Sequence, residues 1–233
     1  TSQCGSADVL EALGVAVDLP PELSVECLRA TGFMFLYAAA LHPALKRVQP
    51  VRRALGFRTI FNLAGPLANP AHAPAQVMGV TARDKLMLVA NTMAKLGVRR
   101  AFVVHGSDGL DELTITGESN LAEVRERTVG LYRAKPEDVG LRPSRLDLLS
   151  GGDAATNAAI LEAIFKGEVG ARRDIVLFNA AAALVVAEQA EDIVEGVTLA
   201  ANAIDSGSAW RTLENVRQHS KEYADTRKSI RSQ

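Results

Sequence analysis

Two adjacent acidic residues, Asp111 and Glu112, have the greatest capacity for chemistry in this sequence. They end the segment GSDGLDE (106–112), which directly follows the apolar run AFVV (101–104) and His105. Such a run predicts a buried strand, and open α/β sheets bind ligands at the carboxyl ends of their strands. Two neighbouring carboxylates there suit Mg²⁺, which takes few protein oxygens and leaves positions for phosphates. On spacing alone, a solvated turn rich in Gly, Asp and Ser is the simpler explanation.

Two further segments carry candidate binding residues. Small residues in TSQCGSAD (1–8) precede a predicted helix, where free backbone N–H groups can meet a phosphate; the alternative is an ordinary cap by Ser6. Arg52 and Arg53 lie in a predicted helix, and either could pair with a carboxylate; the alternative is a solvated helix face. Gly151-Gly152-Asp153 resembles a phosphate loop, but Asp153 is more simply a helix N-cap.

Nucleophilic and zinc chemistry have no support in the sequence. It contains no Ser-His-Asp cue, no H-E-x-x-H motif and no Walker-type glycine loop. His42 precedes Pro43 at a predicted helix start, and His105 is expected to be structural. Two cysteines, Cys4 and Cys27, are too few for a disulfide framework or a thiolate cluster.

The elements that must position these residues follow from periodicity and capping. A strand, a helix and a strand are expected in turn over residues 75–104, which is the βαβ pattern of an α/β domain. Thr81 and Asp84 resemble a capping box for the middle helix, and Gly97 ends it. We expect a strand pair at 121–124 and 129–132, and helices at 6–14, 20–32, 153–166, 179–188, 193–206 and from 208 onward.

Some segments carry more specific expectations. Val25 and Leu28 should be buried, and the apolar run 33–41 should lie deep in a core. The segment FNLAGPLANPA (61–71) is predicted to be an irregular loop because of its prolines and asparagines, and the charged tail from residue 220 is predicted to fray.

Composition excludes several classes of protein. Of the 233 residues, 48% are hydrophobic and 23% charged, which excludes fibrous and wholly disordered chains. The net charge of −1 offers no basic field for nucleic acid, and the longest apolar run is too short to span a membrane. The first residues do not resemble a secretory signal. We therefore expect a cytoplasmic enzyme that binds neither nucleic acid nor membranes.

Five segments occur together in an order that is specific. They are CGSADVLEALGV (4–15), HPALKRVQPVRRALGFRTIFNLAGPLANPA (42–71), VVHGSDGLDEL (103–113), GGDAATNAAI (151–160) and NAAAAL (179–184). In this combination the chain resembles the anthranilate phosphoribosyltransferases, over nearly its whole length.

The resemblance implies an activity, a cofactor and a set of site residues. The family transfers phosphoribose from phosphoribosyl pyrophosphate to the amine of anthranilate, with Mg²⁺ and release of pyrophosphate. Asp111 and Glu112 match its magnesium-binding acids, and Arg52 matches its anthranilate-binding arginine. Thr1, Ser2 and Ser6 match the segment that contacts phosphoribosyl pyrophosphate. No residue is expected to form a covalent intermediate.

The family's fold implies a central sheet surrounded by helices, together with part of a small helical domain, as in class II nucleoside phosphorylases. The expected limits are 1–16 for the start of the α/β domain, 17–58 for the helical domain and hinge, 59–220 for the rest of the α/β domain and 221–233 for a charged tail.

Two family motifs, GTGGD and KHGN, do not occur in the sequence. The chain therefore matches the C-terminal two-thirds of the enzyme, and we expect it to be inactive or nearly so alone, to bind anthranilate weakly and to be rescued only by an N-terminal fragment added in trans. The candidate macromolecular partners are such a fragment and a second copy of the chain in a homodimer, and the oligomeric state stays open. The alternatives are a class II nucleoside phosphorylase-like enzyme and a non-catalytic binding or assembly module.

Overall fold

A computed structural model of the chain describes residues 4–37, 41 and 61–231. The chain divides into two compact units. Unit 1 comprises residues 1–54, 151–168 and 203–233, and unit 2 comprises residues 55–150 and 169–202. The domain limits that the family resemblance implies remain a prediction. The two units are defined by compactness, which is not the criterion by which the family's domains are divided.

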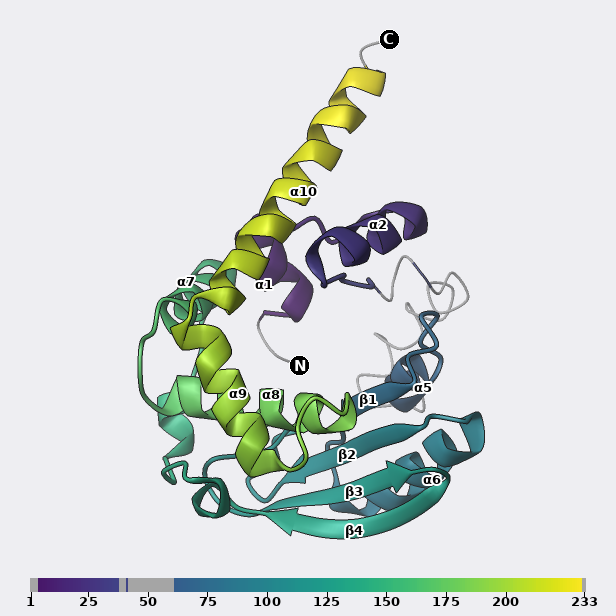
Figure 1. The fold of residues 1–233 in the computed structure, drawn as a ribbon, viewed down its shortest axis with the longest axis vertical. Helices are drawn as coiled ribbons and strands as arrows, with labels where there is room; N and C mark the ends of the chain where they lie inside the picture. The colour runs from purple at the N-terminus through teal and green to yellow at the C-terminus, as the bar shows by residue number, and fades with distance from the viewer. Residues whose placement is uncertain (1–3, 38–40, 42–60, 232–233) are drawn as a thin grey trace, which may run out of the picture. The chain divides into compact units, whose positions relative to one another are not determined.

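Unit 2 is built on a four-stranded sheet in the order β1-β2-β3-β4 (Figure 1). β1 pairs with β2 in parallel, whereas β2 with β3 and β3 with β4 are antiparallel. This confirms the α/β class and all four predicted strands, which are Ala75–Gly79, Arg100–Gly106, Ser119–Arg125 and Thr128–Ala134.

Helices cover both faces of this sheet because the side chains of a strand alternate between its faces. Phe102 and Val104 of β2 join one apolar cluster with residues of α8 (Ala171–Val186). Ala101 and Val103 join a second cluster with residues of α6 (Leu86–Leu96). These four β2 residues are all nearly inaccessible, so this part of the strand is buried on both sides.

The connection from β1 to β2 confirms the βαβ prediction but not its capping box. A short 3-10 helix, η1 (Arg83–Lys85), precedes α6, and its N-cap is Ala82 rather than Thr81. Asp84 instead pairs with the adjacent Lys85, 2.8 Å away. The helix ends as predicted at Gly97, whose φ of 84° suits a residue without a side chain.

Unit 1 is helical. It contains α1 (Ser6–Ala12), α2 (Pro21–Thr31), α7 (Ala154–Phe165) and α10 (Ser208–Arg231). The apolar core brings together residues distant in sequence: Leu13, Val15, Cys27, Ala158, Leu213 and Val216.

Two predictions of burial in unit 1 are wrong. α2 buries Ser24 and Cys27, whereas Val25 and Leu28 are 41% and 39% exposed. Helical periodicity identifies the apolar residues on one face of a helix, but it does not tell which of them a neighbouring element covers. Phe33 and Tyr37 are also exposed, so the expected deep burial fails for the described residues 33–37.

Three helix predictions also differ from the structure. Phe61–Leu67 forms α5, and Pro66 lies inside this helix, so the predicted loop is wrong for these residues. α8 begins at Ala171 rather than 179, and α10 continues to Arg231 rather than fraying after 220. α9 (Ile193–Asp205) and the short helices η2 (Pro136–Val139) and η3 (Leu146–Leu149) complete the described elements. None of the described helices is long and apolar enough to cross a membrane.

Candidate functional site

The acidic pair lies in the loop between β2 and β3, at the carboxyl end of β2 as predicted. The loop begins with a tight turn in which the Gly106 N–H donates to the Leu110 carbonyl at 2.9 Å. Gly109 sits within this turn at a φ of 92°, a left-handed conformation that favours glycine. The turn brings Asp111 and Glu112 directly past the end of the strand.

Asp108, three residues before the pair, anchors the loop internally. Its carboxylate accepts hydrogen bonds from the hydroxyls of Thr114 and Thr116, and from the Leu110 N–H at 3.1 Å. Partial burial opposes the charged form, but these hydrogen bonds outweigh it and hold the pKa of Asp108 below its ordinary value. Asp108 is therefore a fixed negative charge beside the pair.

Glu112 experiences the opposite effect. Its burial, together with the charges of Asp111 and Asp108, raises the pKa of its carboxyl above the ordinary value. Neither Asp111 nor Glu112 has a cationic or hydrogen-bonding partner among the described residues. The loop thus concentrates negative charge that the described part of the chain does not neutralise.

Asn179 of α8 clamps the backbone directly after the pair. Its Oδ1 accepts from the Leu113 N–H at 2.9 Å, and its Nδ2 donates to the Leu113 carbonyl at 2.8 Å. Leu113 itself is completely buried. The segment that follows Glu112 is therefore held to α8 by both of its polar backbone groups.

Gly79 of β1 fixes the other side of the loop. A Cβ at this position would lie 1.6 Å from the backbone oxygen of Asp111, far inside any possible contact. Any side chain at position 79 would displace the loop, so this glycine permits a close approach of two backbones.

Other predicted site residues have mixed outcomes. Thr1, Ser2 and Arg52 lie outside the described residues, as does His42. Ser6 is exposed at the first residue of α1, and the N-cap is Gly5 rather than Ser6. Ser6 belongs to unit 1, and the acidic pair belongs to unit 2.

Two structural alternatives are supported by the geometry. Asp153 accepts from the Thr156 N–H at 2.8 Å and is the N-cap of α7, as predicted. His105 contacts the Val80 carbonyl through Nδ1 at 2.9 Å. Since a carbonyl only accepts, Nδ1 carries the proton, which fits a structural role.

The support that Asp108, Asn179 and Gly79 give to the loop was not predicted from the sequence. Asp108 lies within GSDGLDE, and Asn179 is the first residue of NAAAAL. Both residues thus belong to segments that the sequence singled out, but no role was predicted for either of them. Asn179 and Leu113 are 66 residues apart, and only the fold brings them together.

The donor chemistry of the acidic pair fits a divalent cation. The described residues contain no group of three or more His, Cys, Asp and Glu side chains that could hold a metal by themselves. An open site with two carboxylates suits Mg²⁺, which usually keeps water and takes substrate phosphates as further ligands. The fit is therefore to a cation bound jointly with a phosphate-bearing molecule.

Comparison with known proteins identifies the family of the chain. The profile of the family described as "Glycosyl transferase family, a/b domain" matches residues 1–210. The chain belongs to this family. Among curated members, an anthranilate phosphoribosyltransferase of Symbiobacterium thermophilum is 50% identical over 218 residues, and one of Caulobacter vibrioides is 54% identical over 216.

Solved structures of anthranilate phosphoribosyltransferases share the fold. An anthranilate phosphoribosyltransferase from Thermus thermophilus superposes with a TM-score of 0.87 at 43% identity, covering 93% of this chain and 64% of that one. The enzyme from Saccharomyces cerevisiae in complex with PRPP and Mg gives 0.87 at 25% identity, covering 94% and 63%. The two curated relatives are matched over 94% and 93% of this chain, but only 64% and 63% of their own length.

Proposed function

We propose that this chain contributes to transfer of phosphoribose from phosphoribosyl pyrophosphate to the amine of anthranilate, a step in tryptophan biosynthesis. One observation carries the proposal: the acidic pair, which no cation among the described residues neutralises, lies at the carboxyl end of β2 in a member of this family. The similarity to enzymes of that name supports it.

Asp111 and Glu112 are proposed to hold Mg²⁺ together with the pyrophosphate of the substrate. When bound, the ion supplies positive charge to the leaving group. Asp108 accepts from the Leu110 N–H and Asn179 bonds to both backbone groups of Leu113, so the backbone on either side of the pair is already held before the ligand binds.

The remaining substrate contacts are proposed from the family resemblance. Arg52 binds the anthranilate carboxylate, for which a planar guanidinium is the natural partner. Thr1, Ser2 and Ser6 contact phosphoribosyl pyrophosphate. The proposal needs no covalent nucleophile: the residues position both substrates and stabilise charge while the amine attacks the ribose carbon.

The test is an assay of anthranilate consumption with phosphoribosyl pyrophosphate and Mg²⁺. We expect little turnover by the 233-residue chain alone and an increase when a relative's N-terminal segment is added in trans. That increase should require Mg²⁺ and be lost in the variant Asp111→Asn with Glu112→Gln.

A parallel assay with nucleosides and inorganic phosphate separates the alternatives. Phosphorolysis without anthranilate turnover would replace the proposal with a nucleoside phosphorylase-like activity. No turnover in either assay, even with the added segment, would favour a non-catalytic binding module.

A further inference from the structure

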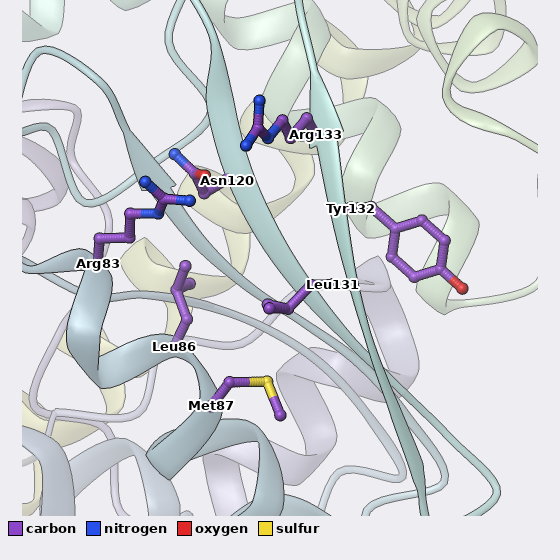
Figure 2. A pocket seen from close by; sticks show the side chains of 7 residues that line it. All are labelled: Arg83, Leu86, Met87, Asn120, Leu131, Tyr132 and Arg133. Carbon is purple, nitrogen blue, oxygen red and sulfur yellow. The ribbon is translucent and has the colours of Figure 1, made fainter.

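Unit 2 contains a pocket of about 240 Å³ between the start of α6 and strands β3 and β4 (Figure 2). Its lining residues are Arg83, Leu86, Met87, Asn120, Leu131, Tyr132 and Arg133. The acidic loop lies on the opposite face of the sheet from this pocket. Met78 and Val80 pack in the apolar cluster that contains α6, and side chains alternate between the two faces of a strand. Gly79, which the loop approaches, therefore faces away from α6. The pocket is therefore separate from the proposed magnesium site.

Three polar side chains from three elements converge in this pocket. Arg83 comes from η1, Asn120 from β3 and Arg133 from β4, and Figure 2 shows their polar ends pointing toward one another. Asn120 and Arg133 are directly opposite in the register of the two strands. Their position is thus set by the sheet.

The positive charge of the pocket is poorly compensated. Within the described part of the chain, the side chains of Arg83 and Asn120 have no partner. Arg133 has one ionic partner there, Glu118, with 3.5 Å between nitrogen and oxygen. Of the two guanidinium groups, only that of Arg133 has a carboxylate partner, and an anion would supply the charge that Arg83 lacks.

An apolar floor lies beside these cations. Leu86 is buried, but Met87 is 38% exposed and Leu131 is 60% exposed. In Figure 2 the Leu131 side chain lies on the pocket side of β4, whereas the Tyr132 ring lies on the other side. Leu131 therefore offers an apolar surface next to the charged groups.

We propose that this pocket binds a small carboxylate with a short apolar body. Arg83 and Arg133 would bind the carboxylate oxygens, since guanidinium groups recognise them by two-point hydrogen bonding. Asn120 would add a neutral donor, and the body would cover Met87 and Leu131. A bare inorganic anion would satisfy the arginines but leave this floor exposed, and the volume admits only a small molecule.

The test is NMR of the 233-residue chain with labelled methionine and leucine methyl groups, titrated with isovalerate. We expect saturable shifts at the Met87 and Leu131 methyls. Acetate should bind about tenfold more weakly because it lacks the apolar body. Inorganic phosphate at equal concentration should leave the Leu131 methyl unchanged.

Two variants assign the effect. Arg83→Gln should weaken isovalerate binding at least about tenfold, because it removes a charged donor. Arg145→Gln is the matched control, since Arg145 is exposed, pairs with Asp147 and does not line the pocket. The proposal is overturned if isovalerate gives no saturable shift, if phosphate competes equally, or if both variants behave alike.

Discussion

At the scale of single residues, Glu112 shows how the fold prepares a binding site at a cost to its own stability. Its carboxyl is partly buried and lies near the charges of Asp111 and Asp108, which raises its pKa. A group whose pKa is raised on folding binds its proton more tightly in the folded state. The ionised form therefore destabilises the fold at neutral pH, and protonation removes that penalty.

We accordingly expect Glu112→Gln to raise the melting temperature of the metal-free chain at about pH 8. The gain should shrink as the pH falls through the raised pKa, and it should vanish below the ordinary glutamate value of 4.5. Thermal melts in a chelator across this range measure it, with the exposed Glu137→Gln as control. A loss of stability at high pH would contradict the interpretation.

Arg52 gives a second prediction at this scale. Removing the charged partner of a desolvated carboxylate typically costs about 2–5 kcal/mol. Arg52→Ala in the complemented enzyme should therefore raise the KM for anthranilate far more than that for phosphoribosyl pyrophosphate. Steady-state kinetics measure both constants. Equal effects on both substrates, or a larger effect of Arg53→Ala, would remove Arg52 from this role.

At the scale of elements, the acidic loop is held between β1 and α8. Gly79 allows the Asp111 backbone to lie against the strand, and Asn179 ties Leu113 to the helix. These two supports come from elements that are distant in sequence. A substitution that disrupts either support would shift the carboxylates. Positioning of the pair is thus a property of β1, the loop and α8 together.

We expect Asn179→Leu to destabilise the chain by about 1–3 kcal/mol for each Leu113 backbone group left unsatisfied. It should also raise the Mg²⁺ concentration needed for half-maximal activity. Denaturant titration and metal activation curves measure the two effects.

The matched control for that variant is Asn157→Leu. Asn157 of α7 makes the same pair of bonds to the Gly152 N–H and carbonyl, at 2.9 and 3.0 Å. Both variants should lose stability, but only Asn179→Leu should change the Mg²⁺ requirement. An equal change in both would reduce Asn179 to a structural residue.

The sequence predicted elements well where local pattern decides them. AFVV is apolar throughout, and it forms the strand that is buried on both faces. The same reasoning failed for Val25 and Leu28, because burial depends on which neighbour covers a helix. The helix at Phe61–Leu67 was missed because its proline suggested a loop.

The residues of the candidate site likewise differ in whether local sequence pattern identifies them. Asp111 and Glu112 could be found because they are adjacent and follow a strand. The clamp by Asn179 could not, since it joins residues 66 positions apart. The unpartnered arginine of the pocket, Arg83, was also invisible, because a missing partner within the described residues is a property of the folded chain.

At the scale of the whole molecule, the chain matches 61–64% of the length of its first curated relatives. Its described part supplies a fixed acidic loop with excess negative charge. Two acids without basic groups repel a polyphosphate unless a cation intervenes. The central claim is therefore that Asp111 and Glu112 recruit a divalent cation together with pyrophosphate.

Electron paramagnetic resonance of Mn²⁺, used in place of Mg²⁺, tests this claim most directly in the presence of pyrophosphate. We predict that Asp111→Asn with Glu112→Gln reduces the bound Mn²⁺ signal at least about tenfold, because charged ligands dominate such sites. The control is Glu137→Gln with Asp138→Asn, which removes an adjacent exposed acid pair on η2 and should leave the signal unchanged. Equal Mn²⁺ binding by the wild type and the Asp111–Glu112 variant would contradict the account.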